Sequence, residues 1–152
     1  MLNRFAAGLS LALYLALGAL GSAADTPDYS KEAAVVQSIA TKVSFTAEGV
    51  REWQQIVSIR VQSEAAVRQY GVLSFSYASG SEQIKVEYVR VRKPDGSITD
   101  TPDSSIVDVT TDVASIAPVY SDLRQKQIPV KALAVGDVLE YSLRSSQRAL
   151  ET

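Results

Sequence analysis

The sequence predicts a mainly β protein, a two-sheet antiparallel β-sandwich with one short helix. Three observations lead to this fold class. Apolar and polar residues alternate with a period of two along several short runs, as in strands that bury one face. Turn residues, chiefly glycine and proline, separate these runs. Only residues 63–70 have the composition of a helix. Short strands joined by frequent turns are typical of a sandwich, here immunoglobulin-like in architecture alone.

A predicted hairpin arm over residues 84–99, IKVEYVRVRKPDGSIT, organises the rest of the chain. Pro94, Asp95 and Gly96 have the residue types of a tight turn. Proline presets φ, aspartate bonds its own backbone, and glycine accepts a positive φ. We therefore expect residues 84–92 and the residues after Gly96 to form paired strands.

The apolar face of this arm changes sides near Tyr88. Ile84, Val86 and Tyr88 share even positions, whereas Val89 and Val91 share odd positions. Because alternate residues of a strand point to opposite faces, a regular strand cannot bury both sets on one side. We expect either a β-bulge there or a strand that passes from one sheet to another.

Two runs before the arm predict another hairpin. Residues 31–46 tolerate helical spacing, but their strand-forming residues lie on odd positions: Val35, Ile39, Val43 and Phe45. The next run repeats the odd pattern with Trp53, Val57, Ile59 and Val61. Because a turn at Glu48 and Gly49 separates the runs, we predict both as strands.

A short helix and a strand follow. In residues 63–70, SEAAVRQY, Ser63 can cap the helix, Glu64 lies in its first turn, and Gly71 can end it. Alternation returns over residues 72–77, where Leu73, Phe75 and Tyr77 share one face. A Ser-Gly-Ser turn then leads into the hairpin arm.

The second half of the chain is less strongly patterned. Residues 106–109 are a short strand candidate, and residues 118–127 are expected to form a loop leading into Ile128. Pro129 suggests a strand that lies at an edge or begins there. Gly136 and Asp137 predict a turn before the last strand, residues 138–143. The polar residues 144–152 show no evident core to join.

The first 24 residues have the pattern of a signal peptide. Asn3 and Arg4 form a short positive region, residues 5–20 are apolar and uncharged, and small residues precede a cleavage site after Ala24. The alternative is a membrane anchor, but the apolar run is shorter than the ~20 residues that a spanning helix needs. We expect cleavage and a periplasmic or secreted protein, with membrane contact only through signal-peptide targeting.

The remaining chain divides into a polar leader at residues 25–32, a β-sandwich domain at residues 33–145 and a polar tail at residues 146–152. The full chain has a formal net charge of −2. This slightly acidic balance offers no basic surface for nucleic acid or anionic lipid, so we expect no nucleic-acid partner.

Histidine and cysteine do not occur in the sequence. Their absence removes imidazole acids and bases, thiol nucleophiles, Ser-His-Asp triads, zinc sites and disulfides. A carboxylate-only hydrolase would need two carboxyl groups about 5–10 Å apart in a cleft, which sandwich loops seldom form. We therefore predict a chain that is not an enzyme and uses no cofactor or metal.

Tyr120, Asp122 and Arg124 are the candidate recognition residues. They could form a small polar cluster for a ligand. In the structural alternative, Asp122 caps a turn and Arg124 pairs with a carboxylate, which holds a long crossing loop. Asp95 and Asp137 adjoin turn glycines, and a structural role explains both.

Three other features have competing interpretations. Trp53 could be a ligand platform on an exposed sheet, or a core residue beside Val57 and Ile59, which we favour. Four aspartates in a polar stretch could supply oxygens to calcium: Asp100, Asp103, Asp108 and Asp112. A solvated loop is the simpler interpretation of this stretch. A row of cations suggests a solvated or edge-protecting face: Lys85, Arg90, Arg92 and Lys93.

Three segments carry a family resemblance through their order and spacing: VRVRKPDG at 89–96, YSDLR at 120–124 and VGDVLEY at 135–141. Together they resemble the bacterial domain of unknown function numbered 3857. The resemblance implies a β-sandwich and an extracytoplasmic setting. In that family the domain typically lies between a signal peptide and a transglutaminase-like domain, which carries the Cys-His-Asp machinery.

The chain departs from that layout because it stops just past the domain. We expect either a fragment of a longer protein or a stand-alone copy, and no catalytic residue carries over because no position matches one. The resemblance implies a non-catalytic accessory module whose partner is a transglutaminase-like domain, in cis or in trans. The alternative is an independent periplasmic binding domain for a peptide or a cell-wall glycan.

Overall fold

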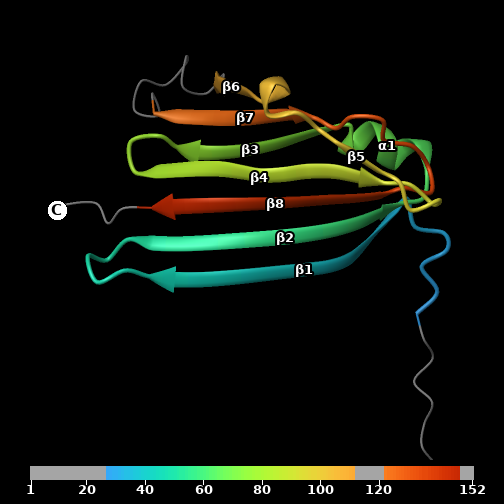
Figure 1. Ribbon diagram of the computed structural model, residues 1–152, viewed down its shortest axis with the longest axis horizontal. Helices are drawn as coiled ribbons and strands as arrows, with labels where there is room; N and C mark the ends of the chain where they lie inside the picture. Colours follow the sequence, from blue (N-terminus) through green and yellow to red (C-terminus); the bar gives the residue numbers. More distant parts are fainter. Residues whose placement is uncertain (1–26, 112–121, 148–152) are drawn as a thin grey trace, which may run out of the picture.

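The computed structural model describes residues 27–111 and 122–147, which form two antiparallel sheets and one α-helix (Figure 1). The predicted mainly β, two-sheet fold with one short helix is confirmed. The predicted signal peptide lies outside the described residues. In chain order the elements are β1 (Ala34–Phe45), β2 (Arg51–Val61), α1 (Glu64–Tyr70), β3 (Val72–Ala78), β4 (Glu82–Arg92), β5 (Ile98–Asp100), the 3₁₀-helix η1 (Asp103–Ser105), β6 (Val107–Thr110), β7 (Leu123–Pro129) and β8 (Val138–Gln147).

The larger sheet has the strand order β1-β2-β8-β4-β5, and the smaller sheet has the order β3-β7-β6. All strand pairs are antiparallel. The predicted hairpin of β1 and β2 is confirmed, and its turn contains Gly49 with φ of +78°. Figure 1 shows α1 at the end of the molecule where β4 ends and β8 begins. Within the two described ranges, no helix is long and apolar enough to cross a membrane.

A β-bulge explains the change of apolar face in β4. The register between β4 and β8 shifts between Val86 and Tyr88, so Glu87 is the extra residue. Both halves of β4 pair with β8 throughout, which confirms the bulge and makes the sheet-switching alternative wrong. The bulge lets Ile84 and Val89 face the same interior despite their opposite parity, and both are buried.

The short helix begins and ends as the sequence predicts. Ser63 is its N-cap, and the Ser63 Oγ accepts a hydrogen bond of 3.2 Å from the Ala66 amide. Ala66 is fully buried. Gly71 ends the helix with φ of −64°, so a positive φ is not the reason for glycine there. A Cβ at Gly71 would lie 3.0 Å from the Val67 carbonyl oxygen, which is closer than ordinary contact. Glycine fits at this position because it has no Cβ.

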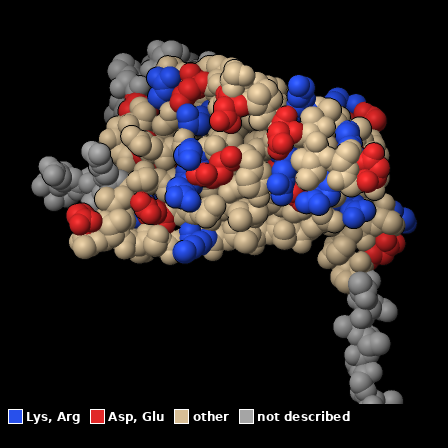
Figure 2. Space-filling view, in the orientation of Figure 1, with Lys and Arg blue, Asp and Glu red and all other residues tan. Residues whose placement is uncertain are grey.

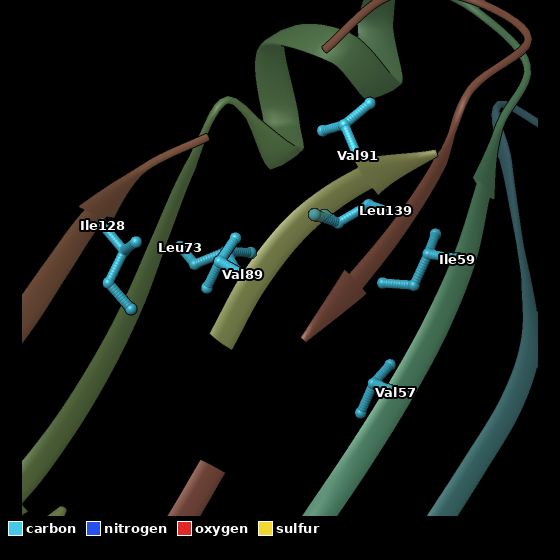
Figure 3. Close-up of a cluster of buried hydrophobic side chains, with 7 residues drawn as sticks. All are labelled: Val57, Ile59, Leu73, Val89, Val91, Ile128 and Leu139. Carbon is cyan, nitrogen blue, oxygen red and sulfur yellow. The ribbon is translucent and has the colours of Figure 1, made fainter. Parts of the chain in front are cut away.

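The main core lies between the sheets (Figure 3). The smaller sheet contributes Leu73 and Ile128, while the larger sheet contributes residues from three strands: Val57, Ile59, Val89, Val91 and Leu139. These side chains are at most 7% exposed. Burying each one contributes roughly 1.5–3 kcal/mol relative to leaving it in water, so this cluster holds the two layers together.

Two predictions about the second half of the chain are wrong. Strand β7 begins at Leu123, within the segment expected to be a loop, and it occupies the centre of the smaller sheet. Pro129 is the last residue of β7 rather than a mark of an edge or a beginning. Proline is tolerated there because its missing N–H falls where the ladder ends, opposite Val72.

Strand β8 continues to Gln147, although residues 144–147 were expected to have no core to join. Its polar residues pair with β2 on one side and β4 on the other. Ser145 is completely buried, and its hydroxyl donates a 2.5 Å hydrogen bond to Glu82. A polar sequence can therefore continue a central strand, because neighbouring strands satisfy its hydrogen-bonding groups.

Candidate functional site

The predicted recognition residues take part in separate hydrogen-bond networks where the structure describes them. Tyr120 lies outside the described residues. The carbonyl oxygen of Asp122 accepts hydrogen bonds from the amide and the hydroxyl of Ser79, at 2.9 and 2.8 Å, and its side chain is exposed. Arg124 instead binds Asp108 across the smaller sheet.

Asp108 is the centre of a polar network on the smaller sheet. Its Oδ1 accepts from Arg124 Nε at 2.9 Å, while its Oδ2 accepts from Lys126 Nζ at 2.7 Å and from the Tyr77 hydroxyl at 2.6 Å. We call Tyr77, Asp108, Arg124 and Lys126 the Asp108 network. Its members come from all strands of this sheet, β3, β6 and β7.

The strand register explains why these residues meet. Tyr77 pairs with Arg124, and Lys126 pairs with Asp108, so cross-strand partners share a face. Leu73, four residues before Tyr77 on β3, lies on the same face and is buried against the larger sheet. The Asp108 network therefore continues the inner face of the sheet beyond the apolar core. Sequence analysis missed it because the partners are distant in the chain.

The network keeps Asp108 ionised. Partial burial alone would raise the pKa of this carboxyl, but hydrogen bonds from Lys126, Tyr77 and Arg124 outweigh burial and lower its pKa to about 2. Burial raises the pKa of Tyr77, and its hydrogen bond to Asp108 adds to the increase. A general acid or base needs a pKa near the working pH, so Asp108 is suited to holding three strands together rather than to proton transfer.

A second carboxylate lies between two turns at the end of the sandwich near α1. Asp137 is only 2% exposed, and its Oδ2 accepts from Lys93 Nζ at 2.7 Å and from the Ala134 amide at 2.7 Å. Lys93 Nζ also donates to the carbonyl oxygen of Ala132. Asp137 therefore does more than adjoin a turn glycine, because it joins the turn after β4 to the turn before β8.

Both turns have the geometry that their glycines allow. Gly96 has φ of +87° and Gly136 has φ of +92°, a region that other residues rarely adopt. Asp95 Oδ1 accepts from the Ser97 amide at 2.8 Å, which closes the first turn. The ring of Pro94 lies 3.7 Å from where a Cβ of Gly136 would stand, so the two turns pack together.

Arg90 and Arg92 do not protect an edge, because residues 90–92 of β4 pair with both β8 and β5, whereas at Lys85 the described partner of β4 is β8 alone. Arg90 and Arg92 bind opposite oxygens of Glu140 at 2.7 and 2.8 Å, and the Arg90 guanidinium lies 4.7 Å from the centre of the Tyr88 ring. Burial would raise the pKa of Glu140, but the two arginines lower it below its ordinary value. Figure 2 shows acidic and basic side chains interspersed over the face in view.

Trp53 lies outside the cluster that contains Val57 and Ile59, so the core interpretation of Trp53 is wrong. It pairs with Val43 near the turn that joins β1 to β2, on the same face as Val57 and Ile59, and is partly exposed. A depression of about 120 Å³ lies on the opposite face of the sheet, so the Trp53 ring points away from its lining side chains: Lys42, Ser44, Glu52, Gln54 and Arg144. This volume is below the roughly 300–1,000 Å³ of ordinary small-molecule pockets.

The described residues contain no group of three acidic side chains that could hold a metal ion. Of the four aspartates considered for calcium, Asp108 is bound by two cations and a hydroxyl, while Asp112 lies outside the described ranges. Each of the three carboxylates described above is held by lysine or arginine. This arrangement stabilises strand and turn contacts and supplies no free carboxylate pair.

The fold and these ionic contacts define a β-sandwich domain whose buried and half-buried charges have structural partners. Residues 47–150 match the family described as "Domain of Unknown Function with solved-structure structure (DUF3857)". The chain belongs to this family, and the resemblance seen in its sequence is confirmed.

One similar solved structure is the crystal structure of a protein from Parabacteroides distasonis, described as a "putative protease". The two share 21% sequence identity and superpose with a TM-score of 0.70. The match covers 76% of this chain but 23% of that protein, so this chain spans under a quarter of its length. At this identity the likeness shows the fold alone. No curated protein matches the chain.

Proposed function

We propose that this chain is a non-catalytic, extracytoplasmic β-sandwich module that serves as the N-terminal accessory domain of a transglutaminase-like peptidase or amidase. One observation carries the proposal: the same fold occupies 23% of a longer protein described as a "putative protease". A domain of this kind would supply a packing or shielding surface, while a neighbouring domain would supply the chemistry.

The chemistry of the chain supports this division of labour. The sequence contains no histidine and no cysteine, so it lacks the side chains that a transglutaminase-like centre uses. Asp108 and Glu140 have lowered pKa values because cations bind them, which makes them poor proton donors at neutral pH. The signal-peptide pattern of residues 1–24 supports export to the periplasm or the medium.

The test is to sequence the gene beyond the codon for Thr152 and to compare the activity of the full-length product with that of residues 25–152 alone. We expect the frame to encode a domain with cysteine and histidine motifs. The longer product should hydrolyse or transfer peptide amides, and residues 25–152 should show no turnover. A stop codon after Thr152 would contradict the accessory role. Turnover of a peptide or glycan by residues 25–152 alone would contradict the non-catalytic assignment.

The second candidate is an independent periplasmic domain that binds a peptide or a cell-wall glycan. The observation in its favour is the partly exposed ring of Trp53, which pairs with the exposed Val43 on one face of the larger sheet. Trp53 is the only tryptophan in the sequence, so its fluorescence reports on this face of the sheet directly. A saturable change in emission with peptidoglycan fragments, lost in Val43→Lys, would favour this candidate over the first, because Val43 is the cross-strand partner of Trp53.

A further inference from the structure

Strand β1 is a long strand with one open side. It has 12 residues and forms an edge of the larger sheet, where it pairs with β2 alone among the described strands. At the opposite edge, β5 has 3 residues and pairs with residues 90–92 of β4, so residues 82–88 of β4 form the rest of that edge among the described strands. An open edge presents unpaired N–H and C=O groups to any strand that approaches it. The open side of β1, which extends over 12 residues, therefore requires an explanation.

The inner face of β1 is apolar and exposed. It carries four large side chains with high exposure: Val36 49%, Ile39 60%, Val43 52% and Phe45 70%. Residues 38–45 contain one charge, Lys42, and no proline or glycine. The bulge between Val36 and Ser38 precedes this stretch and leaves it regular. The usual devices that discourage strand addition are thus nearly absent from residues 38–45.

The hydrogen-bond pattern shows which residues point to the open side. The Thr46 amide donates to the Val50 carbonyl oxygen, and bonded pairs recur at every second residue of an antiparallel ladder. The even residues Ser44, Lys42 and Ala40 therefore bond to β2. The backbone groups of Ile39, Thr41 and Val43 point outward and are available to an added strand.

We propose that β1 forms the interface of a homodimer, in which two copies of β1 pair antiparallel and join the larger sheets into one continuous sheet. The open edge selects an extended strand as its occupant, because only a strand satisfies alternate N–H and C=O groups. Among the described strands, β1 is the longest that has an open side, so a second copy supplies the matching edge. A two-fold pairing also closes on itself and leaves no β1 edge open.

One register fits the sequence best. Pairing about Thr41 uses Ser38 to Ser44, the regular stretch after the bulge. It places Ile39 opposite Val43 of the partner subunit, so that two apolar residues meet. Pairing about Lys42 would instead set two ammonium groups directly opposite, which is destabilising. An edge contact of this kind buries less than the ~800 Å² per partner of a standard interface, so we expect a dissociation constant on the order of micromolar.

Sedimentation velocity over a range of protein concentrations tests the proposal. We expect a reversible monomer–dimer equilibrium, weakened at least tenfold by Thr41→Pro. This proline removes an outward N–H without breaking the ladder to β2. Ile39→Lys should weaken the dimer as well, and it keeps the test valid if the proline variant fails to fold. Ile56→Lys is the matched control, because Ile56 is 41% exposed on the opposite face of the next strand, and its dimer should be unaffected.

Cross-linking tests the register. The native chain has no cysteine, so Thr41→Cys introduces a single thiol. Residues opposite each other in a bonded antiparallel pair have Cα atoms about 5.5 Å apart, which is within disulfide range. We expect mild oxidation to convert Thr41→Cys into a covalent dimer and to leave Ile56→Cys monomeric. A protein that stays monomeric at every concentration, or a dimer that both β1 variants leave intact, overturns the proposal. So does Thr41→Cys that cross-links no faster than Ile56→Cys.

Discussion

Two lysine–aspartate contacts of equal length lie in different parts of the sandwich. Lys93 binds Asp137 at 2.7 Å between the turns near α1, and Lys126 binds Asp108 at 2.7 Å on the smaller sheet. The aspartate side chain is 2% exposed in the first contact and 30% exposed in the second. Equal distances thus occur in unequal dielectric surroundings, and burial rather than length decides how much each contact affects stability.

The two contacts also differ in what remains when a partner is lost. Without Lys93, Asp137 would keep the Ala134 amide as a partner but would stay buried with an unneutralised charge. Without Lys126, Asp108 would keep Arg124 and Tyr77 as hydrogen-bond partners, and water would solvate its carboxylate. The first contact is therefore a requirement for folding at this end, whereas the second is one support among several.

The largest predicted effect is that of Lys93→Met. It should lower the free energy of unfolding by about 3–5 kcal/mol, because it leaves the Asp137 carboxylate buried without a cation. Urea unfolding at neutral pH measures this loss. The matched control is Lys85→Met, since Lys85 is 73% exposed in its contact with Glu87 and should change stability by less than about 0.5 kcal/mol.

A double variant separates pair energy from leftover charge. Lys93→Met combined with Asp137→Asn removes both charges, so it should be more stable than Lys93→Met alone. If Lys93→Met costs less than about 1 kcal/mol, the carboxylate gains water or a proton easily, and the contrast between the two contacts fails.

The next effect is a loss of stability in acid that comes from Asp108. Its pKa is about 2 in the folded protein against an ordinary value of 3.8, so the folded state binds the proton less readily than the unfolded state. The resulting stabilisation is fully present above about pH 4 and is lost as the pH falls towards 2. We expect about 1–2 kcal/mol, reduced by screening at this partly exposed site. Urea unfolding between pH 5 and 2 measures it.

Asp108→Asn is the control for the acid effect. It should be less stable than the native chain at pH 7 and should lose less stability between pH 5 and 2. A native-like pH dependence in Asp108→Asn would assign the acid sensitivity to other carboxyl groups, such as Glu140, whose pKa is also lowered.

The strands and turns were largely predictable because their signals are local. The alternation in β2, the cap at Ser63 and the change of parity in β4 each lie within a few residues. The location of β7 and the end of β8 could not be predicted in this way, because these polar segments pair with strands that are distant in the chain. The alternating pattern identifies a strand only when one face is apolar.

The ionic contacts were missed for a related reason. Lys93 and Asp137 are 44 residues apart, and Arg124 and Asp108 are 16 apart. Their meeting depends on which strands pair and in which register, which single residues do not specify. Charge alternation along β4 was visible in the sequence, but it did not distinguish the buried contact of Lys93 from the exposed contact of Lys85.

The smallest predicted effect separates backbone from charge at the buried end. Gly96 lies three residues after Lys93, has φ of +87°, and would place a Cβ in open space. Gly96→Val therefore meets no clash, and its cost of about 1 kcal/mol comes from a β-branched residue forced to a positive φ. Gly96→Asn is the control and should cost less, because asparagine tolerates this region. The melting temperature of Gly96→Val should be a few degrees below that of the native chain. Equal melting temperatures for all three proteins would mean that the turn relaxes freely, and that Lys93 alone stabilises this end of the sandwich.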